Sequence, residues 1–292
     1  MHGTTATIRA AGAGRVLERL SRANPDWAPW LTAVESVLHA LDQPPATTLA
    51  VRLPSARADG APLLDGATIT LDGKAATSWV ERLFGNAADA LPSGSGGAVH
   101  VGAEAALPLL EAAIERDLMS LCRYGGDVAD GDAAGPVLAL ADLAVHPILQ
   151  ACRAELAPMA PDQWQHGHCP ICGSWAALAE LRGLERVRRL RCVRCGGDWQ
   201  VRWLSCPFCG ENDHRKLGSL TPEHGAETRR IDKCESCRAY VKTVTTLSAT
   251  PPWSVLLDDA ETVDLDVAAM DRGYARPPGG GRDVGVHLEA FP

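Results

Sequence analysis

The sequence lacks the two patterns that would direct a chain into or across a membrane. Residues 1–14 contain no apolar segment followed by a small-residue cleavage site, so we expect no secretory signal peptide. No run of about 18 consecutive apolar residues is present, so we expect no membrane-spanning helix. Together these absences predict a cytoplasmic protein.

Composition places the chain among ordinary globular proteins. Its 292 residues are 46% hydrophobic and 22% charged, and both values are typical of folded, water-soluble domains. A chain of this length is long enough for two domains with sizeable cores. The division between them has to be found from local patterns, which change near residue 163.

The first 162 residues are predicted to form a helical domain. Apolar residues recur at helical spacing in five segments: 16–20, 27–41, 80–84, 107–121 and 137–156. Pro44 and Pro45 are expected to end the second segment, and Pro147 is expected to kink or split the last one. The glycine-rich stretches 92–97 and 125–135 are expected to be loops. We predict a helical bundle whose role is to shape a surface.

From about Gln163 onward the pattern indicates β-structure. Val187–Arg191 and 240–245 have strand character, and Trp199 and Trp203 alternate with polar residues as on one strand. The fold class predicted is α+β, with the helical bundle followed by two tandem rubredoxin-like or zinc-ribbon β modules. The boundaries predicted are 1–162 for the helical domain, 163–205 and 206–250 for the two four-cysteine modules, and 251–292 for a tail that packs on the modules.

Ten cysteines dominate the chemistry of the sequence. In a reducing cytoplasm, paired cysteines more often bind metal or do redox work than form disulfides. Cys122 and Cys152 are isolated in apolar helical patterns and are expected to be small buried hydrophobic residues. The other eight form four Cys-x-x-Cys pairs, namely Cys169/Cys172, Cys192/Cys195, Cys206/Cys209 and Cys234/Cys237.

The four pairs predict two metal ions, each in a four-cysteine site. Two residues between the cysteines let the backbone fold into a tight loop, called a knuckle here, whose two sulfurs face one ion. Pairing of consecutive knuckles leaves gaps of 19 and 24 residues, which suit a β-hairpin, although a cross-braced pairing is also possible. A glycine after the second cysteine favours the positive φ that this turn needs. Three knuckles have that glycine and the fourth has Arg238, which should add strain or change the turn.

A closed four-thiolate site argues against catalysis. Because the cysteines fill all four positions, no position is left for a substrate or a water molecule, and we expect no enzyme. Iron and zinc both suit the ligand set. Redox chemistry of the thioredoxin kind would need a single pair at the start of a helix.

Nucleic acid is not expected as a partner. Residues 166–242 contain 14 Lys/Arg against 9 Asp/Glu, but two ions with four thiolates each would bring the segment close to neutrality. The remainder of the chain is acidic, since the whole chain carries a net charge of −8, and it would repel phosphates.

Ordered motifs in the second half resemble the formate dehydrogenase accessory protein family, the FdhE type. The first three cysteine pairs contribute Cys-Pro-Ile-Cys-Gly-Ser, Arg-Cys-Val-Arg-Cys followed by Trp199, and Cys-Pro-Phe-Cys. The fourth contributes Cys-Glu-Ser-Cys followed by Tyr240-Val-Lys242. The tail adds Asp258-Asp259, Leu265-Asp266 and Gly273-Tyr274-Ala275-Arg276. The resemblance covers about 110 residues, and Arg238 departs from it by replacing a glycine.

This resemblance implies an accessory factor that binds the catalytic subunit of respiratory formate dehydrogenase and assists its assembly in the cytoplasm. It also implies rubredoxin-like sites, for which iron has been proposed. Trp199 and Trp203 are either core residues of a module or contacts for the client. Asp258 and Asp259 are either turn residues or client contacts. A rubredoxin-like redox protein and a zinc-ribbon nucleic-acid-binding protein remain as alternatives.

Overall fold

A computed structural model describes residues 2–90, 102–125, 134–222 and 228–291 of the chain. The expected loop at 92–97 and most of the one at 125–135 lie outside the described residues. Within the described parts, the chain divides into two compact units. The first comprises Met1–Arg57, Leu64–Glu155 and Val284–Pro292, and the second comprises Ala58–Leu63 and Leu156–Asp283.

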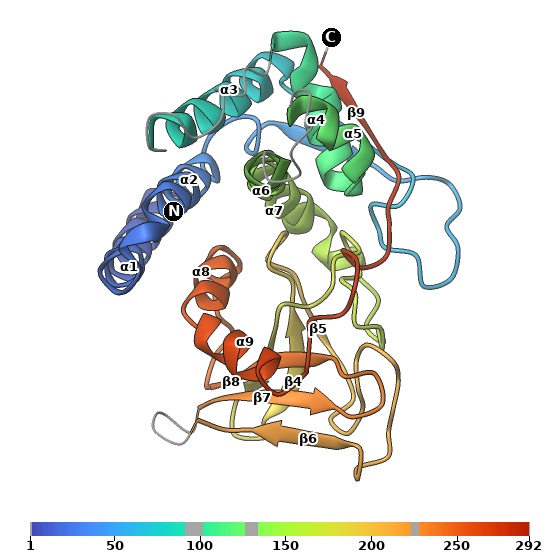
Figure 1. The fold of residues 1–292 in the computed structure, drawn as a ribbon. Coiled ribbons are helices and arrows are strands. Elements are labelled where there is room, and N and C mark those ends of the chain that lie inside the picture. Colours follow the sequence, from blue (N-terminus) through green and yellow to red (C-terminus); the bar gives the residue numbers. More distant parts are fainter. Residues whose placement is uncertain (1, 91–101, 126–133, 223–227, 292) are drawn as a thin grey trace. The chain divides into compact units, whose positions relative to one another are not determined.

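Seven α-helices are described in the first unit (Figure 1). They are α1 (His2–Ala23), α2 (Ala28–Ala40), α3 (Gly73–Ala90), α4 (Ala106–Glu115), α5 (Leu118–Cys122), α6 (Ala134–Ala144) and α7 (His146–Leu156). α6 ends at Ala144 and α7 begins at His146, so the helix is split just before Pro147, as the proline predicts. Short 3₁₀ turns follow α1, α5 and α7 and precede α4, at Pro25–Trp27, Arg123–Gly125, Ala157–Met159 and Ala103–Ala105.

The single helix predicted over 107–121 is wrong, because the chain breaks between α4 and α5. Arg116 ends α4 in the left-handed conformation, with φ of 62°. Asp117 then caps α5, since its Oδ1 accepts a hydrogen bond from the Ser120 amide at 3.2 Å. The apolar spacing continues across the break, which is why the periodicity did not show it.

The core of the first unit lies among α2, α3, α4 and α6. Val34, Leu83 and Leu109 are each fully buried. Trp79 of α3 is only 1% exposed, and its indole Nε1 donates a hydrogen bond to the Ala144 carbonyl at the end of α6, at 2.8 Å. The indole ring is therefore packed in the core while its N–H group has a hydrogen-bond acceptor, as a buried tryptophan requires.

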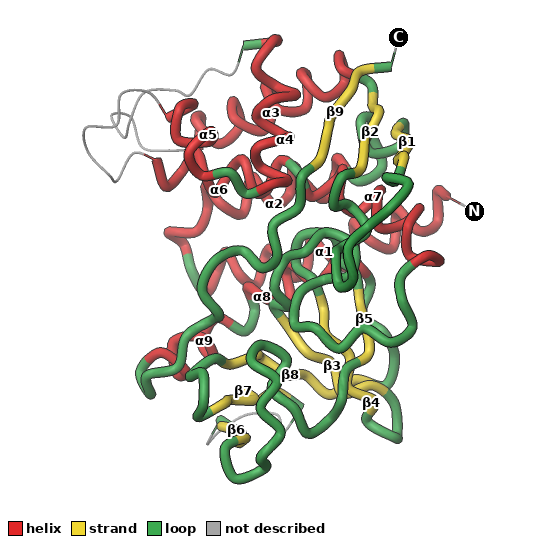
Figure 2. Tube along the Cα trace, turned by 90° about the vertical axis from the view of Figure 1, so that its right-hand side faces the viewer, coloured by secondary structure: helices red, strands yellow, loops and turns green. Residues whose placement is uncertain are grey.

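The first unit also holds a three-stranded sheet that the sequence analysis did not predict. Its order is β1 (Leu49–Arg52), β2 (Ala67–Leu71), β9 (Val286–Ala290), and the three strands lie side by side in Figure 2. β1 and β2 are antiparallel, whereas β2 and β9 are parallel with Ala67 opposite Val286. Glu115 and Glu111 of α4 accept hydrogen bonds from the amides of Val286 and Leu288, at 2.9 and 2.7 Å. The helix therefore binds the outer edge of β9.

The second unit is built on a six-stranded sheet of order β5-β4-β3-β8-β7-β6. Its strands are β3 (Leu178–Arg182), β4 (Val187–Arg191), β5 (Asp198–Gln200), β6 (Leu217–Leu220), β7 (Arg229–Cys234) and β8 (Tyr240–Thr246). The central pair β3 and β8 is parallel, and the other neighbours are antiparallel. One half of the sheet thus comes from β3–β5 and the other from β6–β8, and together with the helices they make the protein a mixed α and β structure.

Two of the predicted strands are confirmed as β4 and β8, and the third is partly wrong. β5 ends at Gln200, so Trp199 lies on it while Trp203 lies in a bend beyond it. The tail forms a 3₁₀ turn at Pro252–Ser254, then α8 (Val255–Ala260) and α9 (Val263–Met270). α9 packs on β7 and β8.

The two isolated cysteines differ in burial, and one helical stretch is strongly apolar. Cys152 is fully buried as predicted, but Cys122 is exposed near the end of α5, so that expectation is wrong. Among the described residues, Gly135–Met159 is one helical stretch long and apolar enough to cross a membrane. Its most apolar part is 61% buried within the protein, as the core helix of a soluble protein also would be.

Candidate metal centres

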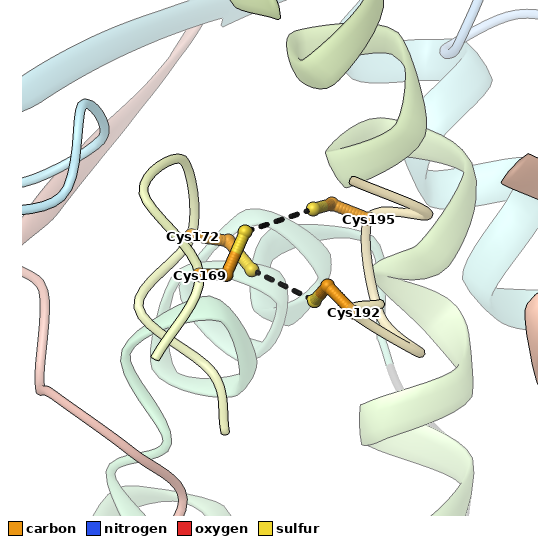
Figure 3. Close-up of side chains that lie close together, drawn as sticks. All are labelled: Cys169, Cys172, Cys192 and Cys195. Atoms are coloured by element: carbon orange, nitrogen blue, oxygen red, sulfur yellow. Dashed lines mark hydrogen bonds between the residues drawn. The ribbon is translucent and has the colours of Figure 1, made fainter. Parts of the chain in front are cut away.

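The first cysteine cluster forms where two knuckles meet at the end of the β3–β4 hairpin. The Cys169/Cys172 knuckle precedes β3, and the Cys192/Cys195 knuckle joins β4 to β5. The Sγ atoms of Cys169 and Cys195 are 3.5 Å apart and those of Cys172 and Cys192 are 3.4 Å apart (Figure 3). All four sulfurs lie within 4.8 Å of one another.

The second cluster repeats this arrangement with the β6–β7 hairpin. The Cys206/Cys209 knuckle lies between β5 and β6, and the Cys234/Cys237 knuckle joins β7 to β8. The Sγ separations are 3.7 Å for Cys206–Cys237 and 3.8 Å for Cys209–Cys234. Consecutive knuckles are therefore grouped in both clusters, rather than cross-braced.

All four knuckles share one backbone turn. The amide of each first cysteine donates to a carbonyl five residues later, at 2.8 to 3.0 Å, with acceptors Ser174, Gly197, Glu211 and Ala239. The residue after each second cysteine has positive φ: 76° at Gly173, 69° at Gly196, 76° at Gly210 and 58° at Arg238. The fourth knuckle therefore keeps the turn despite its arginine, so the departure introduces strain rather than a different turn.

Contacts of the Arg238 side chain offset this strain. Its guanidinium lies 4.0 Å from the ring centroid of Tyr274 and donates to a Glu235 carboxylate oxygen at 2.6 Å. It also donates to the carbonyl of Arg272 at 2.9 Å. The arginine thus ties the fourth knuckle to the tail, which a glycine could not do.

Comparing two substitutions of Arg238 separates backbone strain from side-chain contacts. Arg238→Ala and Arg238→Gly both lose the contacts, but only glycine relieves the left-handed backbone. We therefore expect the Gly variant to be more stable than the Ala variant by about 1 kcal/mol in urea unfolding. Gly210→Ala, at φ of 76°, is the matched control and should destabilise by about 1 to 2 kcal/mol. Equal stability of the two Arg238 variants would contradict this account.

The sulfur geometry fits a bound ion better than disulfides. A disulfide needs sulfurs about 2.05 Å apart, whereas the contacts here are 3.4 to 3.8 Å. Metal–sulfur bonds of about 2.3 Å place the corners of a tetrahedron about 3.8 Å apart. The donor set of four cysteines therefore fits one zinc or iron ion in each cluster, with no open position.

The pKa values of the clustered thiols are shifted by their surroundings, and thiolates at these positions would need a cation beside them. Burial raises the pKa of the Cys169 thiol, whereas hydrogen bonds from Cys169, Cys192 and Cys195 lower the pKa of Cys172. In the second cluster, burial raises the pKa of the Cys206 thiol well above its ordinary value. Four thiolates in so confined a space require a neutralising charge, which a divalent ion would supply.

Two buried arginines flank the first cluster. Arg194 is 4% exposed, and its positive charge lowers the pKa of Cys172. Arg191 is 2% exposed, pairs with Glu180, and donates to the Thr250 carbonyl at 2.9 Å. Glu180 is itself only 1% exposed, so a complete ion pair supports the base of the knuckle inside the protein. The role of Glu180 could not be predicted from the sequence, because a single glutamate in a strand does not indicate a buried ion pair.

The tail is fastened to β8 by a buried ionic network. Lys242 is fully buried, and its Nζ lies 2.7 Å from both Asp259 Oδ1 and Asp266 Oδ2. Arg276 reaches the same two carboxylates at 2.7 and 3.0 Å. A small hydrophobic cluster containing Tyr240 and Leu265 packs beside it. The tail motifs that carried the family resemblance therefore meet the β8 motif in space.

The four candidate contact residues lie in different surroundings. Trp199 is 3% exposed and its indole donates to the His166 carbonyl at 2.9 Å, which is a core position. Asp259 belongs to the ionic network. Asp258 is partly buried, and burial together with nearby acidic groups raises its pKa to about 6. Trp203 is 45% exposed, with the Arg230 guanidinium 5.7 Å from its ring.

Known proteins that are similar to this chain are FdhE proteins. No family model matches the sequence. Protein FdhE of Escherichia coli O127:H6 is 26% identical over 254 residues, which is 84% of this chain and 76% of that protein. The FdhE homolog of Edwardsiella ictaluri is 26% identical over 242 residues, 80% and 74% of the two chains. The chain is therefore similar to FdhE proteins over most of its length.

Two further comparisons show where FdhE proteins resemble this chain. The crystal structure of FdhE from Pseudomonas aeruginosa matches with a TM-score of 0.58 at 22% identity and covers 92% of both chains, so the fold is shared along the whole length. The FdhE homolog of Stutzerimonas stutzeri is 32% identical over 111 residues, 37% of this chain and 35% of that protein. These similarities to FdhE proteins confirm the resemblance that the cysteine and tail motifs indicated.

Proposed function

We propose that the chain is a non-catalytic accessory factor that binds the catalytic subunit of respiratory formate dehydrogenase in the cytoplasm and assists its assembly. Similarity to FdhE proteins over most of the chain carries this proposal. The two closed cysteine clusters support it, because a site with four protein ligands leaves no position for substrate. Such a site is suited to holding a surface in shape rather than to catalysis.

The eight paired cysteines are the proposed ligands of two ions, iron or zinc. Residues 163–205 and 206–250 would then be two rubredoxin-like or zinc-ribbon modules, flanked by the helical domain 1–162 and the tail 251–292. A bound ion supplies folding free energy to a small module whose own core is limited. The two cysteine-joined hairpins of the six-stranded sheet support this division.

We place the client surface at a pocket beside the second cluster that is lined by both apolar and charged residues. The pocket has a volume of about 180 Å³, and its lining includes Trp203, Leu204, Phe208 and Leu217. Trp203 and Leu204 are 45% and 61% exposed, and neighbouring exposed apolar residues with a concave floor are typical of protein-binding sites. Trp203 and Asp258 are the proposed client contacts. Trp199 and Asp259 would act by supporting the surfaces around them.

Loss of the gene tests the proposed function. We expect formate-dependent dye reduction by the host to fall severalfold, while a second respiratory dehydrogenase keeps its activity. Expression of the chain should restore formate oxidation. In co-purification with the catalytic subunit, Trp203→Ala should weaken recovery, whereas Leu247→Ala, at an exposed apolar residue outside the pocket lining, serves as the control. Unchanged formate oxidation after deletion would make the proposal wrong.

One observation favours a second candidate, a rubredoxin-like redox protein. Cys209 and Cys237 of the second cluster are exposed, and a metal near the surface can exchange electrons with a partner. Such a protein would hold iron and show the visible absorption of an iron–thiolate site. A colourless, zinc-loaded protein from anaerobic purification would exclude electron transfer.

A further inference from the structure

The two cysteine clusters share a ligand set but differ in access from solvent. In the first cluster all four cysteines are fully buried. In the second, Cys206 and Cys234 are 5% and 2% exposed, whereas Cys209 and Cys237 are exposed. One cysteine from each knuckle of the second cluster therefore faces solvent.

Packing around the first cluster explains why it is closed. Pro252 lies so close to Gly196 that a Cβ at this glycine would be 2.6 Å from the proline ring. Gly281 on the tail lies against the first knuckle in the same way, since a Cβ there would be 2.1 Å from the Gly173 carbonyl oxygen. The amide of Arg282 donates to that same carbonyl at 2.8 Å. The tail thus covers one knuckle of the first cluster at Gly281 and another at Pro252.

The second cluster is held from outside by polar side chains. Ser236, between the cysteines of the fourth knuckle, donates to Glu211 Oε2 at 2.6 Å. Lys216 binds the same carboxylate at 3.0 Å. Gly210, unlike Gly196, has nothing within 4 Å of the place where its Cβ would lie. Arg238 ties the fourth knuckle to the tail, and Gly167 packs against Pro207 of the third. The two knuckles are joined to each other by the surface hydrogen bond of Ser236 to Glu211, here called the Glu211 clasp.

We propose that the second cluster is an exchangeable metal site, open to thiolate ligands and thiol-reactive compounds through Cys209 and Cys237, while the first cluster is a permanent structural site. This inference rests on the proposed occupancy of both clusters and is independent of the client. Either exposed cysteine can be displaced by an incoming thiolate. The displaced sulfur then takes a proton from water, so no oxidant or reductant is involved. In the first cluster the same displacement requires the covering tail to open first.

Metal release from the full-length protein tests this proposal. The chain is loaded with zinc until metal analysis gives two equivalents, and then mixed with an excess of a chromogenic chelator. We expect one equivalent to leave about 10 to 100 times faster than the other, because release from the first cluster requires local opening. Cys209→Ser should hold one equivalent and show the slow phase alone. Glu211→Ala, which keeps every ligand, should accelerate the fast phase and leave the slow one unchanged.

Alkylation of the native protein tests independently which cysteines are accessible from solvent. Iodoacetamide labelling mapped by peptide mass spectrometry should modify Cys209 and Cys237 well before the four cysteines of the first cluster. Exposed Cys122 and buried Cys152 mark the fast and slow limits within the same chain. Release of both equivalents in a single phase would overturn the inference, as would equal labelling of both clusters. A chain that binds no zinc at all would instead overturn the proposed metal sites.

Discussion

Replacing Cys192 by alanine is expected to remove the ion from the first cluster and to unfold the β3–β5 half of the second unit. A structural zinc site contributes an apparent binding free energy of about 10 to 16 kcal/mol. The free energy of unfolding of a whole domain is only about 5 to 15 kcal/mol. With Cys192 fully buried, no water or other side chain can take its place as a ligand. The loss therefore exceeds what the small surrounding core can offset.

Metal analysis and amide hydrogen exchange would measure this result. The Cys192→Ala variant should hold at most one equivalent and lose exchange protection in β3, β4 and β5. Cys206→Ala should also hold one equivalent, but lose protection in β6, β7 and β8 instead. Cys122→Ala, outside both clusters, should retain two equivalents and is the control. Two equivalents in the Cys192 variant would show that the ligand assignment is wrong.

Replacing Lys242 by methionine is expected to destabilise the second unit by about 3 to 5 kcal/mol, the range for removing one partner of a buried ion pair. Methionine can fill the volume, but among the described residues it leaves Arg276 as the one cation paired with Asp259 and Asp266. The tail should then detach from β8. Urea unfolding followed by circular dichroism would measure the loss.

Two further variants separate the effect of losing a buried ion pair from the effect of losing a lysine charge at the surface. Lys216→Met removes an exposed pair with Glu211 and should change the stability little, because solvent screens such a pair. Adding Asp266→Asn to Lys242→Met should recover part of the stability, because one of the two uncompensated carboxylates is removed. A Lys242 variant no less stable than the Lys216 variant would show that the network does not hold the tail.

Local chemistry is what could be predicted from the sequence. A Cys-x-x-Cys knuckle is completed within six residues, so its turn, including the positive φ at Gly173, follows from the sequence alone. The strand character of Val187–Arg191 and the break before Pro147 are also local. The gap lengths favoured the observed grouping of consecutive knuckles, since each gap holds one hairpin, but they left a cross-braced pairing open.

Features that depend on distant partners could not be predicted. β2 and β9 each alternate apolar and polar residues over five positions. They pair across most of the length of the chain, however, so neither local pattern identifies its partner strand. Lys242 looks like an exposed strand residue until the tail brings two carboxylates to it. The exposure of Cys209 and Cys237, against the burial of the first cluster, depends on where the tail packs rather than on the cysteine motifs.

The parallel pairing of β9 with β2 affects the order in which the protein can be completed during translation. The ribosome synthesises the whole second unit before it reaches β9. Until then β2 has β1 as its one strand neighbour, and the carboxylates of Glu111 and Glu115 have no strand to bind. A nascent chain stalled before Val286 would therefore carry a finished cysteine-rich unit beside an unfinished helical one, with an open sheet edge that chaperones could recognise.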